Sequence, residues 1–326
     1  MYSALLTRIF DERFRIAENR FYFMGKEILQ ENGILRFTPN ISYSHGNFSK
    51  LREEHSKLQL DSVNCTRDRL NTILIRTNWP AEYFKDKLVL ECGCGAGPDT
   101  EILLNFGAKV VSVDIDSVDI CKANIGEHPN FFIFQASIDD LPFREKAFDI
   151  VFCHRVIHHT PSPAKTLDHI LSFVKNDGAV FVESYARSIN QMISWKYALR
   201  PISRRMNPDL LYKTVKAYIP ALFKFTNFIR KIPPDLLGRI FFEIANHFIP
   251  IRNYRFASQF SNKSDEFIME YAIHDTFDCL SPRYDYPLCA RRFREIAKKH
   301  LHNSFEIVGS SPIWAGSTIL RTRLTD

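Results

Sequence analysis

From residue 87 onward, short apolar runs alternate with segments whose apolar residues recur at helical spacing. Apolar runs bounded by turn residues are typical of buried strands, and helical spacing between them predicts βαβ units. The expected strands are 88–91, 109–114, 131–135, 148–153, 179–184, 305–309 and 317–322, and the expected helices are 99–107, 117–125, 163–174 and 290–301. Asn176-Asp177-Gly178 is expected to form a turn before the fifth strand. This alternation predicts an α/β fold whose mostly parallel sheet is covered by helices on both faces.

Two segments depart from this alternation. The first begins as a polar, mixed leader and continues with amphipathic helical patterns at 48–60 and 67–76. The second is helical, aromatic and basic, and is punctuated by prolines. The pattern therefore predicts an N-terminal helical extension and cap (1–86), a first part of the core (87–185), a helical insertion forming a lid or acceptor region (186–275), and the C-terminal part of the core (276–326).

Charge is distributed unevenly along the 326 residues, whose formal net charge is +6. Between Asn190 and Asn262 there are twelve Lys or Arg and three Asp or Glu. Three interpretations of this basic segment stay open: a lid with a solvated face, a grip on an acidic acceptor, and a surface for nucleic acid. Its mixture of charge with apolar helical faces favours a membrane-surface or lipid-linked substrate over RNA.

Other features of the chain bear on location and on metals. The seven cysteines show no paired spacing, which indicates reduced thiols and no structural zinc site. The first residues are too charged for a signal peptide, and no window has the apolar length of a membrane span. We therefore expect a cytoplasmic protein without a metal, and the basic segment leaves the inner face of a membrane open as a second location.

The segment LECGCGAG (90–97) places three glycines directly after a buried strand. A dinucleotide fingerprint needs a glycine at position 98, where Pro98 stands, and the Lys-Ser/Thr of a P-loop is missing. Glu91 would repel a pyrophosphate and favour a cation, while Asp114, at the end of the next strand, could accept hydrogen bonds from ribose hydroxyls. Together these residues predict a site for S-adenosylmethionine. The alternatives are a tight turn at the glycines and a helix N-cap at Asp114.

The segments VLECGCGAG, VVSVDID, QASIDDLPF, FDIVFCHRVIHHTPSP and VKNDGAVFVESY resemble class I S-adenosylmethionine-dependent methyltransferases. The flanking segments NGILRF, QLDS and TFDCLSPRYDYP resemble a narrower group often encoded beside bacterial polysaccharide or lipopolysaccharide genes. The resemblance implies a Rossmann-like sheet of seven strands in the order 3-2-1-4-5-7-6. It also implies a cofactor, S-adenosylmethionine, over the carboxyl ends of strands one and four.

Carried over residue by residue, the resemblance and the loop pattern give one cofactor-binding set: Glu91, Cys92, Gly93, Gly95, Gly97, Asp114, Ile115, Ser137, Ile138 and Cys153. Where Ser137 stands the family commonly has an acid, so adenine selection here would depend on backbone and on Ile138. Many relatives begin with a small zinc ribbon, and residues 1–64 contain no cysteine.

Candidate catalytic residues follow the fourth strand, where His154, His158 and His159 stand. A histidine is a natural general base for a hydroxyl nucleophile, although packing and turn roles compete for each of the three. His274, Asp275, Tyr284 and Asp285 could also enter the site, but turn and capping roles are favoured for them.

The function we predict is O-methylation of an acidic glycan, sugar-nucleotide or lipid-linked acceptor. An RNA or small-aromatic-metabolite methyltransferase and a non-catalytic cofactor-binding scaffold in a glycan assembly complex remain as alternatives.

Overall fold

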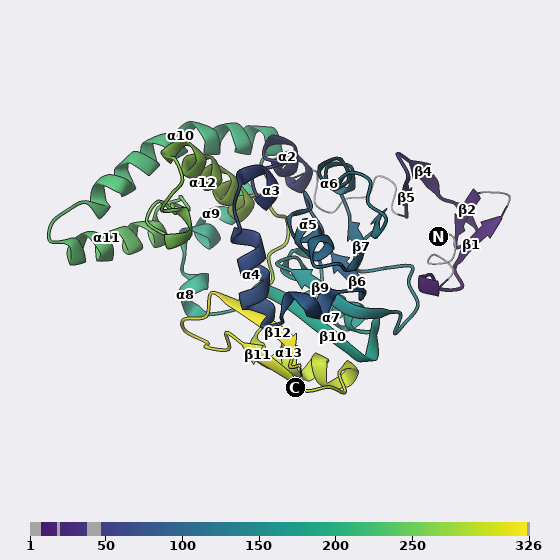
Figure 1. Cartoon of the computed structure of the whole chain (residues 1–326). Helices are drawn as coiled ribbons and strands as arrows, with labels where there is room; N and C mark the ends of the chain where they lie inside the picture. Colours follow the sequence, from purple (N-terminus) through teal and green to yellow (C-terminus); the bar gives the residue numbers. More distant parts are fainter. Residues whose placement is uncertain (1–7, 18–19, 38–46, 325–326) are drawn as a thin grey trace.

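The computed structural model describes residues 8–17, 20–37 and 47–324. A nine-stranded sheet in the order β11-β12-β10-β9-β6-β7-β8-β5-β4 forms the centre of the molecule, with helices packed against it (Figure 1). Seven consecutive strands of this sheet are β6 (Leu88–Cys92), β7 (Lys109–Asp114), β8 (Phe131–Gln135), β9 (Phe148–His154), β10 (Val174–Tyr185), β11 (Phe305–Val308) and β12 (Ser317–Thr322).

These seven strands are the ones that the sequence predicts. The strands from β8 across to β10 are parallel, and β12 and then β11 join antiparallel at one edge. The seven predicted strands therefore follow one another in the sheet in the predicted order, from β8 to β11. The predicted count of seven is wrong, because β5 (Ile34–Arg36) pairs with β8 in parallel and β4 (Leu29–Glu31) extends that edge.

The N-terminal extension is therefore not helical throughout. Besides β4 and β5, it forms a separate antiparallel sheet of β1 (Phe14–Ala17), β2 (Arg20–Phe23) and β3 (Lys26–Glu27). Aromatic packing explains why this segment is extended: the ring of Phe10 stacks on Phe14 at 4.1 Å between centroids and meets Phe134 of the core edge to face at 5.4 Å. The predicted helical patterns farther on are present as α2 (Asn47–Glu54), α3 (Asp61–Asn64) and α4 (Asp68–Thr77), and the short helix η1 (Ala81–Phe84) leads into β6.

Helices α5 (Pro98–Asn105), α6 (Val118–Ile125), α7 (Pro163–Leu171) and α13 (Ala290–His300) lie where the helical spacing predicts them. The central residues of β6, β9 and β10 are buried, because helices cover both faces of this part of the sheet. The turn predicted at Asn176-Asp177-Gly178 is wrong, because strand β10 runs through these residues. The pairing of β10 with β9 is irregular between Val174 and Ala179.

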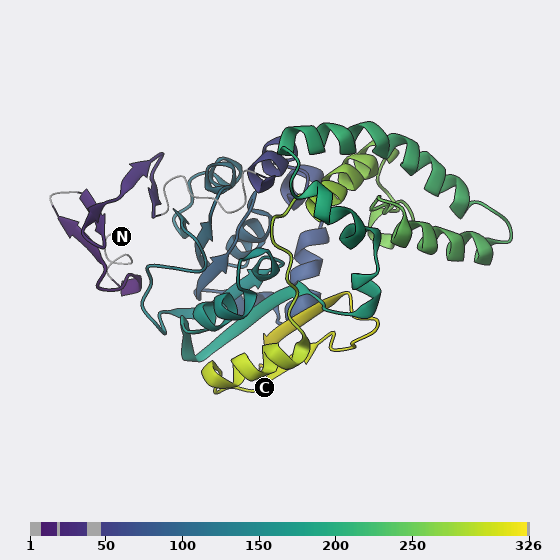
Figure 2. The ribbon, with the colours of Figure 1, turned by 180° about the vertical axis from the view of Figure 1, so that it is seen from behind.

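The insertion is helical, as its pattern indicates. It contains α8 (Ile189–Met192), α9 (Trp195–Ser203), α10 (Pro208–Arg230), α11 (Asp235–Phe248), η3 (Ser258–Phe260) and α12 (Asp265–Leu280). Helices α10 and α11 form a long hairpin that projects away from the sheet in both views (Figures 1 and 2). Helix α12 packs against α10 and continues to Leu280, past the predicted boundary at residue 275. Among the described helices, none has the length and apolarity needed to cross a membrane.

Candidate functional site

A cavity of about 730 Å³ opens at the carboxyl ends of β6, β7 and β9. This is where open parallel sheets bind their ligands, because the loops that follow neighbouring strands converge there. One end of the cavity is lined by the glycine loop after β6 together with Asp114, Ile115 and Ile138. The other end is lined by side chains from α2, from the segment after β9 and from the insertion.

The glycine loop forms its wall of the cavity from main chain. Gly93 has φ +82°, and a Cβ built on it would lie 2.5 Å from the Cγ2 atom of Val156, so no larger residue fits without displacement. Gly95 also has positive φ, lines the cavity, and donates its N–H to the Oδ2 atom of Asp114 at 2.9 Å. The loop therefore needs glycine for conformation and for close approach at once.

Asp114 holds this loop in place. Besides the Gly95 N–H, its Oδ1 atom accepts hydrogen bonds from the N–H groups of Asp116 and Ser117, each at 3.0 Å. These are bonds of an Asx turn that precedes α6, whose N-cap residue is Ser117, so the N-cap role that the sequence leaves open for Asp114 is not the one observed. A carboxylate has about four acceptor positions, so three bonds leave room for one more donor. The predicted bond to a ribose stays a prediction.

Glu91 lies beneath the loop and does not line the cavity. Its side chain is buried, its Oε2 atom accepts hydrogen bonds from Thr100 at 2.7 Å and Ser112 at 2.5 Å, and Oε1 has no partner among the described residues. Burial and the nearby Asp99 raise the pKa of Glu91 to about 7, although the two hydrogen bonds lower it. The argument that Glu91 offers a negative charge to a cation in the cavity is therefore corrected, because the carboxyl is half neutral near pH 7 and faces the protein interior.

The ten predicted cofactor residues divide evenly. Gly93, Gly95, Asp114, Ile115 and Ile138 line the cavity, whereas Glu91, Cys92, Gly97, Ser137 and Cys153 do not. Cys92 and Cys153 are buried in the core of the sheet, and Gly97 is the N-cap residue of α5, where an added Cβ would lie 3.0 Å from the Cys121 sulfur. Position along the sequence could not separate these groups, because the split depends on which way each residue faces.

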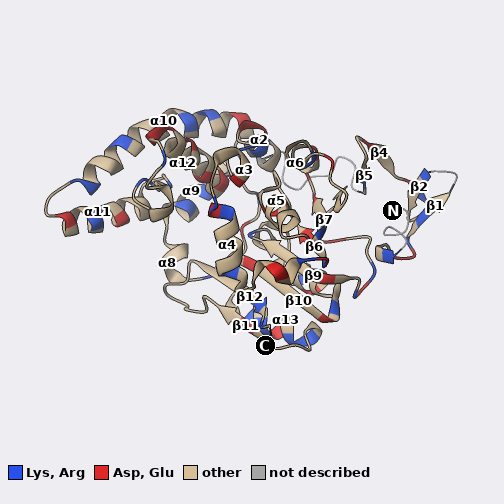
Figure 3. Ribbon diagram, in the orientation of Figure 1, with Lys and Arg blue, Asp and Glu red and all other residues tan. Residues whose placement is uncertain are grey.

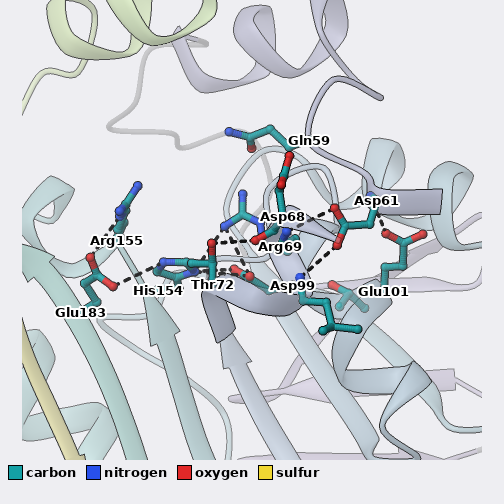
Figure 4. A network of polar contacts seen from close by, with 12 residues as sticks. Gln59, Asp61, Asp68, Arg69, Thr72, Asp99, Glu101, His154, Arg155 and Glu183 are labelled. Carbon is teal, nitrogen blue, oxygen red and sulfur yellow. Dashed lines mark hydrogen bonds and ion pairs between the residues drawn. The ribbon is translucent and has the colours of Figure 1, made fainter. Parts of the chain in front are cut away.

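A network of buried charges forms the floor between the two ends (Figure 4). The ring of His154 lies between two carboxylates, with Nδ1 at 3.0 Å from Asp99 and Nε2 at 3.5 Å from Glu183. Arg69 on α4 approaches Asp99 at 3.4 Å, and Arg155 donates to Glu183 at 3.2 Å. These contacts fasten the N-terminal helix α4 to the core strands.

The network sets the charge of His154. Burial alone would lower its pKa, but Asp99 and Glu183 outweigh burial and raise it. Burial likewise opposes ionisation of Asp99, yet Arg69 and His154 bring its pKa down to about 2. The two carboxylates thus favour the protonated form of His154, which makes it a poorer candidate for a general base than a neutral histidine, and its catalytic role stays a prediction.

The other two predicted histidines differ from each other. His158 is fully buried, with Nδ1 near the Ser184 hydroxyl at 3.2 Å, and does not line the cavity. His159 in the short helix η2 (Ile157–His159) does line it. The Nδ1 atom of His159 lies 3.1 Å from the carbonyl oxygen of Tyr284. A carbonyl can only accept, so Nδ1 carries the proton and the lone pair is on Nε2.

Burial lowers the pKa of His159, and Asp285 and Asp278 only partly offset this effect. The ring is therefore neutral at neutral pH. Among His154, His158 and His159, only His159 combines a free lone pair with a place on the cavity wall.

His158, His159 and Asp285 bring potential metal-ligand atoms within 4.8 Å of one another, although the sequence predicts no metal. The ammonium group of Lys196 already stands 2.5 Å from the Asp285 carboxylate, and Arg200 lies near the same oxygen at 3.8 Å. These two cations take the position that a metal would need, so the arrangement gives no support for an ion. The absence of a metal stays a prediction.

The acceptor end of the cavity draws on residues that sequence reasoning missed. Tyr254 donates to Asp275 at 2.5 Å, Asp275 contacts His274 at 2.8 Å, and His274 contacts Arg52 of α2 at 3.2 Å. His274 and Asp275 thus enter the cavity, whereas Tyr284 and Asp285 do not line it. Other lining residues of this end are Phe48, Gln59, Tyr185, Gln259, Phe260, Phe267, Tyr271 and Asp278.

The basic character of the insertion does not reach the cavity. Its lining residues from the insertion are aromatic, neutral or acidic, and the arginines on the cavity wall are Arg52, Arg69, Arg76 and Arg155, which all lie outside it. The interpretation of the basic segment as a grip on an acidic acceptor is therefore not supported by where its charges lie.

Residues 90–182 match the family model described as "Methyltransferase domain". This match covers the glycine loop, Asp114 and the His159 segment. It supports a methyltransferase that uses S-adenosylmethionine as its cofactor.

Proteins similar to this chain match it over only part of their length. An uncharacterized protein of Methanocaldococcus jannaschii is 26% identical over 197 residues, which is 58% of this chain and 80% of that protein. A ubiquinone biosynthesis O-methyltransferase of Coxiella burnetii is 29% identical over 107 residues, which is 32% of this chain and 46% of that protein. The chain thus spans about half the length of the characterised relative. A solved S-adenosylmethionine-dependent methyltransferase of Mesorhizobium loti has 16% identity and a TM-score of 0.33, covering 37% of this chain and 54% of that one.

The cavity residues of the methyltransferase domain suit the cofactor. Ile115 and Ile138 supply apolar surface for a base, the Gly93–Ala96 main chain allows close approach, and Asp114 keeps an acceptor position for a hydroxyl. Arg52 adds a cation beside Gly95, and its Nε atom is buried without a partner among the described residues. An orphaned guanidinium nitrogen beside open main chain suits the carboxylate of an amino acid.

Proposed function

We propose that the protein methylates a hydroxyl oxygen of a glycan, sugar-nucleotide or lipid-linked acceptor. When bound, S-adenosylmethionine supplies a methyl group on a positively charged sulfur. The observation that carries the proposal is that one cavity is lined both by the glycine loop and by His159, whose Nδ1 atom is held by the Tyr284 carbonyl. An O-methyltransferase needs a nucleoside site and a neutral base on one wall, and this chain offers both.

In this proposal His159 takes the proton from the acceptor hydroxyl. Its Nδ1–H is held by the Tyr284 carbonyl, which orients the ring and keeps the lone pair on Nε2. Tyr254, Tyr271, Gln59 and Gln259 offer hydroxyl and amide groups to a polyhydroxylated acceptor, and Phe260 and Phe267 offer apolar surface. This mixture of aromatic and neutral polar groups suits the sugar part of the proposed acceptor.

The ubiquinone biosynthesis O-methyltransferases among the relatives methylate oxygen, as their name says, and this supports oxygen as the methylated atom here. The match with this chain covers less than half the length of these relatives. The acceptor-end residues Tyr254 to Asp278 lie outside the matched domain. Acceptor identity is therefore a matter for assay.

Binding of the cofactor is tested first by calorimetry with S-adenosylhomocysteine. We expect Asp114→Ala to weaken binding by about tenfold or more, because it removes the acceptor of three loop N–H groups and the predicted ribose contact. The matched control is Asp119→Ala on α6, whose carboxylate pairs with Arg36 and does not line the cavity. Equal losses in both variants, or binding of NAD in place of S-adenosylhomocysteine, would contradict the proposal.

Transfer is tested with methyl-labelled S-adenosylmethionine and two acceptor pools. Label entering a cell-envelope lipid and glycan extract supports the proposed acceptor class. Label entering only total RNA would favour the RNA alternative. Cofactor binding without transfer to envelope extract, RNA or small aromatic hydroxyl compounds would favour a non-catalytic scaffold.

A further inference from the structure

The second helix of the projecting hairpin, α11, is apolar on its outer side. Leu236, Leu237, Ile240, Phe241, Ile244 and Phe248 are all exposed, and Leu236 is exposed to 67%. At 100° per residue these positions span one broad face of the helix. We call these six residues the α11 stripe. A surface helix ordinarily places polar residues outward, so the stripe is a face without a partner.

The inner side of α11 is packed, which shows that the stripe is not simply the core side of the helix. Gly238, Phe242 and Ala245 are buried against the hairpin. A Cβ on Gly238 would lie 2.4 Å from the carbonyl oxygen of Arg230, so the helix approaches the end of α10 as closely as its main chain allows. Asn253, which follows α11, donates to Thr226 and Asn227 near the end of α10, each at 2.8 Å.

Cations accompany the stripe on the same hairpin. Residues 204–252 contain nine Lys or Arg and three Asp or Glu. Basic positions recur along α10 (Figure 3). Lys224, Lys231 and Arg239 are exposed in the residues around the turn between α10 and α11, as are Phe225 and Phe228, the latter to 68%. An anionic surface fits this charge, and a second copy of the same positive hairpin would be repelled by it.

We propose that the α10–α11 hairpin docks on an anionic lipid bilayer, with the α11 stripe lying in the interface. A helix with an exposed apolar face and neighbouring Lys or Arg binds such surfaces through buried apolar area and attraction to anionic headgroups. Because the described helices include no membrane span, the contact is peripheral.

The docking has a consequence for the cavity. The hairpin joins the acceptor end through Tyr254 and η3 at its base, so membrane contact would hold that end near the bilayer surface. The inference stands apart from the proposed acceptor, because a membrane-docked enzyme could still act on a soluble sugar nucleotide.

The test is co-sedimentation of the full chain with vesicles of phosphatidylglycerol and phosphatidylcholine. The variant Ile240→Glu/Ile244→Glu places two charges in the stripe at residues exposed to 45% and 50%. We expect it to lower vesicle binding by about 100-fold or more, because each isoleucine loses its apolar transfer energy. The matched control, Ile16→Glu/Leu29→Glu, makes the same change at residues of β1 and β4 exposed to 41% and 51%.

Wild-type protein and the control variant should sediment with the mixed vesicles, bind phosphatidylcholine alone more weakly, and detach as salt is raised. Wild-type protein that stays in solution with the mixed vesicles would overturn the inference, as would equal binding by the two glutamate variants. A wild-type dimer that Ile240→Glu/Ile244→Glu dissociates, without vesicle binding, would overturn it in favour of self-association.

S-adenosylhomocysteine binding is measured on the same samples. Unchanged affinity in Ile240→Glu/Ile244→Glu shows that its loss of vesicle binding is not a loss of fold. Failure of wild-type protein to bind S-adenosylhomocysteine would count against the proposed function alone.

Discussion

The two ends of the cavity differ in whether main-chain or side-chain groups line them. The cofactor end is mostly main chain, supplied by one contiguous loop and by the residues that end β7. The acceptor end is mostly side chain, supplied by α2, η2, η3 and α12, which lie far apart in the sequence. A main-chain site tolerates little change in shape, whereas a side-chain site can change its ligand through single substitutions. Substitutions at the two ends should therefore have separable effects, on affinity at one and on turnover at the other.

The largest effect is expected at His159. His159→Gln should lower kcat by about 10² to 10⁴, because a positioned general base contributes this much, while the affinity for S-adenosylhomocysteine stays the same. Burial lowers the pKa of His159, so wild-type activity should fall only as pH drops below the ordinary histidine value of 6.5. Rates measured across pH at saturating cofactor would check this fall in activity at low pH, the acid limb of the profile. The acid limb should disappear in the variant.

The control for His159 is His302→Gln, an exposed histidine beyond α13. It should leave rate and pH profile unchanged. An acid limb that persists in His159→Gln would place the base elsewhere at the acceptor end, with His274 as the next residue to substitute.

At the cofactor end, two glycines form a matched pair. Gly93 and Gly126 both have positive φ, +82° and +75°, but only Gly93 has a neighbour that an added Cβ would strike. Gly93→Ala should therefore weaken S-adenosylhomocysteine binding by about tenfold to 100-fold, from about 1–3 kcal/mol of overpacking against Val156. Gly126→Ala also places a side chain at positive φ and should leave affinity nearly unchanged, because nothing lies within 4 Å of its added Cβ.

Calorimetry on both variants decides this comparison. Removing the obstacle in Gly93→Ala/Val156→Ala should restore part of the affinity, because the strained φ remains. Equal losses at Gly93 and Gly126 would mean that strain alone, rather than close approach, makes glycine necessary in the loop.

The same contrast explains what the sequence predicts well. Periodicity predicts the seven strands β6 to β12 and the helices between them, because each depends on local patterns of burial. It misses β1 to β5, where aromatic residues such as Phe14 and Phe23 pack on the core without a clear alternation, and it mistakes Asn176-Asp177-Gly178 in β10 for a turn. Turn residues within a strand are tolerated there because the pairing with β9 is irregular at that point.

For the site, the sequence predicts positions better than directions. Asp114 and Gly95 line the cavity as expected, whereas Glu91 and Cys153 face the interior. The acceptor end was missed because Arg52, Tyr254 and Asp275 come together only through tertiary packing of distant helices. The one usable signal was the pair His274 and Asp275, which the sequence placed near the site without a role.

The smallest effect is expected beneath the cofactor end, at Glu91. Its pKa in the folded protein is about 7, against an ordinary value of 4.5. A carboxyl whose pKa is raised on folding favours the folded state at low pH, and this contribution is lost as pH rises from 4.5 to 7. Glu91→Gln keeps the neutral form, so it should match wild-type stability at pH 4.5 and exceed it at pH 8 by up to about 3 kcal/mol.

Urea unfolding at the two pH values would measure this difference, with the exposed Glu127→Gln as control. Affinity for S-adenosylhomocysteine should change by less than about twofold in Glu91→Gln, because the carboxyl does not line the cavity. A large loss of affinity with unchanged stability would mean that the Glu91 charge acts on the ligand after all. The cofactor end would then depend on a side chain as the acceptor end does, and the contrast between the two ends would fail.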